Sequence, residues 1–223
     1  MIVNLKTYGI IEVELKPGES FLGERGSMAF CDGDILYQPF GASVIESVKR
    51  FLGGESIFPM VNFSNNGKAA ATIKLRYDIL GKTWHNLHRA KSDILVLNLL
   101  ELGGDFTVHP GCFFAATSGV NVGCVFDFSL GRSVFGFGRL IQQKLVGNGT
   151  VFLKKDRLII LEIKTLALDQ VITVDPVEIF GYSTAALKIK SGFSMKSFLV
   201  GEGFSSYTFK GPGTLYTYSQ KPL

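Results

Sequence analysis

Cysteine, histidine and tryptophan are scarce in this chain of 223 residues, which has 3 Cys, 3 His and 1 Trp. Cys31, Cys112 and Cys124 are odd in number, lie far apart and form no CxxC pair. A secreted disulfide framework is normally even-numbered and denser. We therefore expect reduced, buried thiols that pack as small apolar groups, and a cytoplasmic protein.

Long apolar runs are also missing. The longest uncharged stretch, residues 110–126, contains several glycines together with Ser, Thr and Asn, and is too short and too polar to span a bilayer. The first residues enter strand-like sequence directly and contain no apolar core of signal-peptide length. The sequence thus predicts no transmembrane segment, and it leaves peripheral membrane contact open.

A strong charge of one sign is absent as well. The chain has 23 basic and 19 acidic residues, a formal charge of +4. A protein that binds phosphate backbones usually carries a concentrated basic stripe. The densest basic groups here, at 82–91 and 154–157, are typical of solvated turns. We expect no nucleic-acid partner on this evidence.

Nucleotide-binding loops are missing too. There is no Gly-x-x-x-x-Gly-Lys-Ser/Thr sequence, and the glycines of 131–138 lack the strand–helix setting of a dinucleotide fingerprint. The sequence therefore predicts no cofactor.

Glycine and phenylalanine are abundant instead, with 26 Gly for turns and 19 Phe for half-buried pleated faces. Period-two alternation predicts strands at 8–15 and 70–77, the latter with Lys74 and Arg76 on one face. Two further strand signals, 150–153 and 158–163, flank a predicted hairpin tip at 155–157. The exception to this β pattern is a predicted short helix over 42–52, ended by two glycines.

Turn signals recur three times along the chain. The opening signals are 15–21, 102–106 and 168–171, and the closing glycine turns are 65–67, 147–149 and 211–213. We take six residues as markers of the repeat: Gly54, Glu55, Gly149, Gly201, Glu202 and Gly213. This period is too long for a solenoid unit. It predicts one domain, 1–223, with internal repeats at approximately 8–90, 95–165 and 166–219.

Several motifs carry a resemblance to a known family. They are Leu15-x-Pro17-Gly18-Glu19, Gly26-Ser27-Met28-Ala29-Phe30, Leu52-Gly53-Gly54-Glu55-Ser56-Ile57-Phe58, Val174-Asp175-Pro176, Gly201-Glu202-Gly203-Phe204 and Gly211-Pro212-Gly213. From about Tyr8 to Tyr218 the chain resembles the bacterial branch of the mitochondrial biogenesis ("altered inheritance of mitochondria") family, a domain of unknown function. The resemblance implies an all-β fold akin to the tryptophan RNA-binding attenuation protein, with repeated β-sandwich modules, of which the turn signals predict three. It associates mitochondrial relatives with inner-membrane organisation and implies no established activity for bacterial ones. Family members often carry a His shortly after the Val-Asp element, where this chain has Pro176-Val177-Glu178. We therefore expect no role here for that imidazole.

Histidine and cysteine offer two weak constellations. His85 and His88 would share a helix face, but lie on opposite faces of a strand, and a metal would need a third ligand. The nearest acidic candidates in sequence are Asp78, Asp93 and Glu101. His109 lies close to Cys112, but no motif supplies the orienting third group of a nucleophilic dyad. A loop position and a core thiol are the simpler interpretations.

Three glutamates and three aromatic groups can also be explained by structure instead of chemistry. Glu19, Glu55 and Glu202 stand beside glycines at similar points, which favours turn-capping carboxylates over acid/base catalysts. The aromatic groups at 126–128, 135–137 and 216–218 could stack bases on an exposed sheet, yet they are more typical of β cores. Exposed ones would mark a protein or membrane contact.

No catalytic, cofactor-binding or metal residue is assigned from these patterns. The leading hypothesis is a non-enzymatic soluble scaffold or binding module that self-associates and has an unknown protein partner. The alternative is a ligand- or metal-binding protein or hydrolase with an unrecognised site. The third hypothesis is RNA binding, which rests on fold analogy alone.

Overall fold

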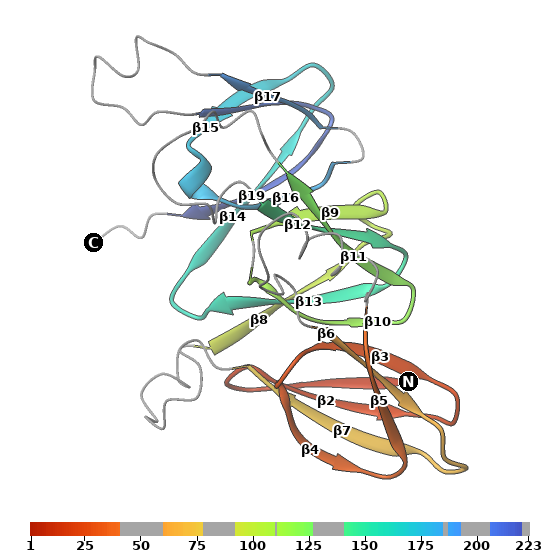
Figure 1. Ribbon diagram of the computed structural model, residues 1–223. Helices are drawn as coiled ribbons and strands as arrows, with labels where there is room; N and C mark the ends of the chain where they lie inside the picture. Colours follow the sequence, from red (N-terminus) through yellow and green to blue (C-terminus); the bar gives the residue numbers. More distant parts are fainter. Residues whose placement is uncertain are drawn as a thin grey trace, which may run out of the picture. The chain divides into compact units, whose positions relative to one another are not determined.

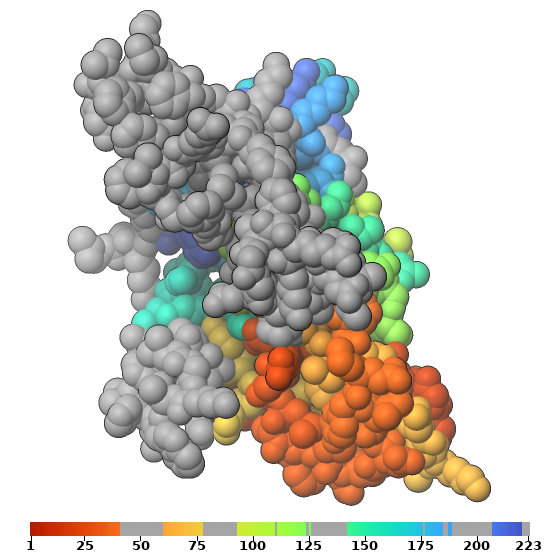
Figure 2. Space-filling model, in the orientation of Figure 1, coloured from red at the N-terminus to blue at the C-terminus, as the bar shows by residue number. Residues whose placement is uncertain are grey.

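A computed structural model of the chain describes residues 1–40, 60–77, 92–109, 111–126, 141–184, 187–192 and 206–219, coloured in Figures 1 and 2. These residues form four antiparallel β-sheets, here called A to D, and one short 3-10 turn, η3 (Pro176–Glu178). No α-helix occurs among them. The all-β prediction is confirmed, and the helix predicted over 42–52 lies outside the described residues.

Sheets A and B contain the N-terminal strands. Sheet A has the order β1 (Ile2–Lys6), β2 (Ile10–Leu15), β7 (Ala71–Arg76), β4 (Met28–Asp32). Sheet B has the order β5 (Ile35–Pro39), β6 (Met60–Asn65), β3 (Ser20–Glu24), β10 (Phe113–Thr117), β13 (Thr150–Asp156), β8 (Ser92–Asn98).

Sheets C and D contain the remaining strands. Sheet C has the order β11 (Val120–Phe126), β12 (Ile141–Gly147), β9 (Asp105–Val108), β16 (Ile179–Tyr182), β19 (Gly213–Ser219), β14 (Ile160–Leu166). Sheet D has the order β15 (Val171–Val174), β18 (Ser206–Lys210), β17 (Lys188–Gly192).

The described chain falls into two compact units. The first contains Met1–Asn98, Gly111–Val120 and Gly149–Leu158, and the second contains Leu99–Pro110, Asn121–Asn148 and Ile159–Leu223. In the first unit, sheets A and B contribute to one apolar cluster that includes Val13, Ile73 and Phe21. In the second unit, sheets C and D contribute to another, around Phe209 and Leu215. Fully burying one such side chain stabilises the fold by about 1.5–3 kcal/mol.

Alternation along β7 accounts for its place in the first core. Ala71, Ile73 and Leu75 are buried, whereas Lys74 and Arg76 lie on the opposite face. Because successive side chains of a strand point to opposite sides of the sheet, this pattern buries one face and hydrates the other. The strand predicted at 70–77 is confirmed with its two faces.

Three two-stranded antiparallel ribbons share one arrangement, in which the paired strands of one sheet continue as a pair in another sheet. A ribbon made by β2 and β7 in sheet A continues as β3 and β6 in sheet B. The same relation joins β8 and β13 in sheet B to β9 and β12 in sheet C, and β14 and β19 in sheet C to β15 and β18 in sheet D. Each ribbon therefore passes from one sheet into the next. The division into three sandwich modules, and into repeats within one domain, stays a prediction.

The six turn signals of the sequence lie where these ribbons change sheet. Each opening turn is hydrogen-bonded to the closing glycine turn of its own ribbon. The amide of Gly18 donates to the carbonyl of Asn65 (2.8 Å), that of Gly147 to Gly104 (2.9 Å), and that of Gly211 to Gln170 (2.9 Å). The turn pairs thus close the backbone hydrogen bonding at each bend.

A left-handed residue occurs in each opening turn. Gly18 has φ 78° and Gly104 has φ 92°, and the third ribbon places Asp169 at φ 63°. Glycine adopts this region without a Cβ penalty, and aspartate is among the few other residues that visit it. The third turn signal therefore lacks the glycine of the other two and keeps their backbone shape.

The hairpin predicted around 155–157 is wrong. The flanking strands belong to different sheets: β13 pairs with β8 and β10 in sheet B, and β14 pairs with β19 in sheet C. Asp156 accepts the amide of Leu158 (2.9 Å) in the turn between them. Both flanking strands find non-local partners, which local spacing does not reveal.

Candidate functional site

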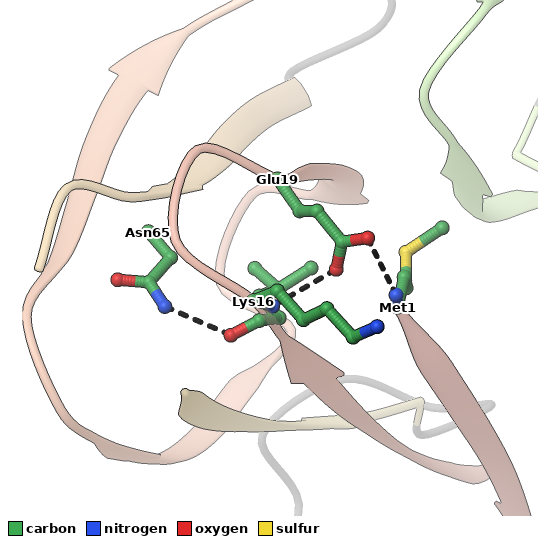
Figure 3. A network of polar contacts seen from close by, with 5 residues as sticks. Met1, Lys16, Glu19 and Asn65 are labelled. Carbon is green, nitrogen blue, oxygen red and sulfur yellow. Dashed lines mark hydrogen bonds and ion pairs between the residues drawn. The ribbon is translucent and has the colours of Figure 1, made fainter. Parts of the chain in front are cut away.

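Glu19 lies in the bend that leads from β2 to β3, and both of its carboxylate oxygens are engaged (Figure 3). Oε1 accepts from the N-terminal ammonium of Met1 (2.6 Å), and Oε2 accepts from the backbone amide of Lys16 (2.9 Å). The hydrogen bond from the ammonium is the largest cause that lowers the pKa of this carboxyl, followed by the Lys16 amide. At neutral pH the group is an ionised acceptor, so it is unsuited to donate a proton as a general acid.

Asn65 holds the other side of the same bend. Its Nδ2 donates to the carbonyls of Leu15 and Ala69, each at 2.8 Å, and its Oδ1 accepts from the amide of Gly67 (2.9 Å). The side chain is fully buried, and its hydrogen bonds satisfy backbone groups of the bend. The sequence singled out 65–67 for its glycine. Asn65 is the residue there that connects the turn to β2.

Asp105 performs a related task at the second bend. Its carboxylate accepts from the amide of Thr184 (2.9 Å) and from the hydroxyl of the same residue, and it pairs with Lys144 (3.3 Å). Ser183 donates its hydroxyl to the carbonyl of Leu102 (2.6 Å) nearby. The acidic residues of the first two bends are thus engaged in structural contacts. Glu55 and Glu202 lie outside the described residues.

Cys112 is partly buried, and desolvation of its sulfur raises the pKa of the thiol to about 11. The ammonium of Lys154 opposes this shift to a smaller extent. Because the thiolate is the nucleophilic form, the side chain is almost wholly in its unreactive form at neutral pH. His109 is partly exposed. The simpler interpretation of Cys112, a structural thiol, fits this environment.

Cys31 and Cys112 are less buried than the sequence predicted, and the side chain of Cys124 lies outside those that the structure describes. Cys31 and Cys112 carry free thiols, as expected, but both are only partly buried. Cys31 lies on β4, an edge strand of sheet A, which has a neighbouring strand on one side only. An edge position leaves the small side chain of Cys31 accessible although Phe30 beside it in sequence is apolar.

Metal binding finds no support in the described part of the chain. His85 and His88 lie outside it, as does Asp78. Asp93, another third-ligand candidate, pairs with Lys155 (3.1 Å) and accepts the amide of Ile94 (2.9 Å). No group of three or more His, Cys, Asp or Glu side chains suited to a metal ion occurs among the described residues.

Two of the repeat markers are described, and both are tightly surrounded. A Cβ on Gly149 would lie 2.6 Å from Oγ1 of Thr117 and 2.8 Å from Cγ2 of Val120. A Cβ on Gly213 would lie 2.5 Å from Cγ of Leu187. These glycines allow close packing where strands begin. Gly54 and Gly201 lie outside the described residues.

The aromatic group at 216–218 is part of the second unit's interior. Tyr216 is buried and packs edge-on against Phe106, with ring centroids 5.2 Å apart. Thr217 is buried as well, and the ring of Tyr218 packs on Phe180. Rings used in this way offer no platform for nucleic-acid bases. The groups at 126–128 and 135–137 lie outside the side chains that the structure describes.

Sequence reasoning missed the polar side chains inside sheet C. Gln142 is buried and accepts a hydrogen bond from the hydroxyl of Tyr182 (2.7 Å). Thr107 is paired in register with Tyr182, and its buried hydroxyl has no hydrogen-bond partner. The available signal was a polar pair, 142–143, that follows Leu140 and Ile141 and precedes Lys144.

Exposed apolar side chains gather on the edge strands of the sheets. Of the sixteen large apolar side chains exposed in the described residues, ten lie on strands at a sheet edge and one, Val146, lies on an interior strand. The ten are Ile2 and Leu5 on β1, Met28 and Phe30 on β4, Leu36 and Tyr37 on β5, Val96 on β8, Ile160 and Ile163 on β14, and Val171 on β15. Part of this surface, formed by β4 and β5, belongs to the orange region of Figure 2.

The sequence model of the mitochondrial biogenesis AIM24 family matches residues 1–220. The chain belongs to this family. The resemblance inferred from the sequence motifs is thereby confirmed over nearly the whole sequence. None of the curated proteins matches the chain. Within the described residues, no helix is long and apolar enough to cross a membrane.

A solved structure shares the fold of this AIM24 family member. It is the crystal structure of protein SPYM3_0169 from Streptococcus pyogenes, a structural genomics target. The likeness has a TM-score of 0.62 at 20% sequence identity and covers 99% of this chain and 93% of the other. At this identity the match establishes the fold alone.

Proposed function

We propose that this AIM24 family member is a non-enzymatic cytoplasmic scaffold or binding module whose sheet edges bind protein chains, first of all further copies of itself. The observation that carries the proposal is the concentration of exposed apolar side chains on edge strands. An edge strand presents unpaired backbone N–H and C=O groups, and apolar side chains beside them make it a template for another strand.

The chemistry of the candidate groups supports the same proposal. Glu19 is held ionised by an ammonium and an amide, Asp105 is engaged by Thr184 and Lys144, and the Cys112 thiol has a raised pKa. An acid/base or nucleophilic site needs groups poised near neutral pH that face a substrate. Glu19 and Asp105 instead hold bends of the chain, and the Cys112 thiol is protonated at neutral pH.

Native mass measured against protein concentration tests the proposal. Sedimentation velocity should show a mass above that of one 24.4 kDa chain, with a share of assembled protein that increases with concentration. If apolar edges drive assembly, it should persist in about 1 M salt, where the Debye length is about 3 Å. A single-chain mass at every concentration would count against self-association.

The other two hypotheses lack a specific observation in their favour. A metal- or ligand-binding protein or hydrolase depends on His85 and His88 or on an unrecognised site, and no described cluster of ligating side chains supports it. RNA binding depends on the analogy of fold, and the aromatic group at 216–218 is largely buried.

A further inference from the structure

Strand β14 ends sheet C with side chains exposed on both of its faces, while its last residue, Leu166, is buried. Ile160 is 54% exposed and Ile163 is 58% exposed. The side chains of Glu162 and Lys164, which form an ion pair with each other (3.5 Å), are 55% and 43% exposed. Figure 1 shows β14 beside β19, with which it pairs from Ile160 to Leu166. A six-stranded sheet thus ends on a seven-residue strand that carries two exposed isoleucines.

In the first ribbon, the strand equivalent to β14 has a neighbouring strand on both sides. Its opening strand, β2, pairs with the closing strand β7 on one side, just as β14 pairs with β19. On its other side, β2 pairs antiparallel with β1 along the whole of that strand. No strand of the described residues takes the place of β1 beside β14. Its outer backbone groups therefore have no strand partner within that part of the chain.

The sequence of β14 is complementary to itself. It reads Ile-Leu-Glu-Ile-Lys-Thr-Leu from 160 to 166. If two copies pair antiparallel about a two-fold axis at Ile163, the isoleucines face each other. Glu162 of each copy then lies opposite Lys164 of the other. Directly opposite side chains on one face of an antiparallel pair are close enough for opposite charges to attract.

We propose that β14 is a homodimer interface, in which two copies pair through this strand about Ile163 and join their C sheets across the axis. The inference deepens the proposed self-association and rests on it. Its occupant is a second copy of this chain, because the charge order fits its own reverse. A two-fold contact of this kind uses the same patch on both partners and closes on itself.

The charges also select the register. An axis at Glu162 would place the two copies of that carboxylate opposite each other, and an axis at Lys164 would do the same with two ammonium groups. Like charges directly opposite one another destabilise a strand pair. Of these three registers, the one centred on Ile163 pairs opposite charges.

Two matched lysine substitutions test the location of the interface. Ile163→Lys places two ammonium groups across the axis and should raise the dimer dissociation constant at least tenfold, equivalent to about 1.4 kcal/mol. Val146→Lys is the control, because Val146 is exposed on β12, an interior strand of the same sheet. It should leave dimerisation unchanged. Circular dichroism reports whether each variant keeps its β structure.

A charge exchange tests the register. Glu162→Lys places a lysine of each copy opposite Lys164 of the other. It should therefore raise the dimer dissociation constant by about as much as Ile163→Lys does. The double variant Glu162→Lys/Lys164→Glu restores opposite charges in every pair and should return the dissociation constant to within about threefold of the wild-type value. Glu162 and Lys164 also form an ion pair within one chain (3.5 Å), which the exchange restores as well, so circular dichroism of each variant shows whether the strand itself is kept.

The outcomes separate the interface from self-association as such. Dimerisation that is lost in Ile163→Lys, kept in Val146→Lys and rescued by the charge exchange supports the proposal. An assembled wild-type protein that is indifferent to substitutions at 162 and 163 overturns the β14 interface and leaves self-association standing. A wild-type protein that stays a single chain overturns both.

Discussion

Single side chains in this protein hold the bends between sheets. Glu19 joins the N-terminal ammonium to the amide of Lys16, and Asn65 joins β2 to the following turn. Charge-assisted hydrogen bonds such as those to Glu19 are shorter and stronger than neutral ones. Glu19 therefore acts in the fold as an acceptor that holds the N-terminus against the first bend.

Removal of the Glu19 charge should change how stability depends on pH. The pKa of this carboxyl is lowered by the Met1 ammonium and the Lys16 amide. A carboxyl with a depressed folded pKa adds stability above its unfolded pKa and loses it as pH falls through the folded value. Glu19→Gln should therefore be less stable than the wild type at neutral pH, and the difference should shrink below about pH 4.3.

Urea unfolding at a series of pH values measures this difference. Glu14→Gln, at an exposed position on β2, is the matched control and should reduce stability by less at neutral pH. A difference between Glu19→Gln and the wild type that stays constant down to strongly acid pH would show that the charge of Glu19 plays no part.

At the scale of strands and turns, the sequence predicted where a strand lies and which face it buries, but it did not predict the strand's partners. Alternation correctly predicted β7 and its buried face, because a side-chain period of two is a local property. The same local reasoning placed a hairpin at 155–157, where β13 and β14 instead enter sheets B and C. Partner choice depends on contacts far apart in sequence, and neighbouring strands in the chain need not pair.

Gly149, in the closing turn of the second ribbon, is tightly surrounded by its neighbours. Gly149→Ala would place a Cβ within 3.0 Å of side-chain and backbone atoms of Thr117, Val120 and Ser118. We expect it to lower the free energy of unfolding by about 1–3 kcal/mol, as overpacking of a filled site does. Thermal or urea unfolding measures this loss.

Gly123→Ala is the control for Gly149→Ala. The nearest atom to its added Cβ is the carbonyl oxygen of Lys144, 3.9 Å away, which is ordinary contact. It should change the free energy of unfolding by no more than about 0.5 kcal/mol. Equal losses in the two variants would mean that strand glycines matter here for a reason other than crowding.

At the scale of the whole molecule, the sheets end in strands that carry exposed apolar side chains. Natural proteins usually protect sheet edges with charge, proline, bulges or a covering segment. Sheet A has β1 beside β2, whereas in the described residues β14 ends sheet C without such a strand. This contrast between equivalent positions is the basis for assigning self-association to one particular edge.

Self-association should make thermal stability depend on protein concentration. A partner that binds only the folded chain stabilises it by mass action, so the melting temperature of the wild type should rise with concentration. Ile163→Lys should melt at a temperature independent of concentration, whereas Val146→Lys should behave as the wild type does. Differential scanning calorimetry over a range of concentrations provides the measurement. Parallel behaviour of Ile163→Lys and the wild type would contradict the β14 assignment.

The sequence by itself determined the β class, the family and the places where the chain turns. Alternation, the glycines and the turn residues at 15–21, 102–106 and 168–171 are local features, and local backbone preferences express them directly. The tertiary structure decided which strands pair and at which bend each turn lies. It also decided whether Glu19 and Cys112 face a partner or water, and which edges stay open. These depend on contacts between residues distant in the chain, so the meaning of a residue such as Ile163 becomes visible only when its strand is placed at the end of a sheet.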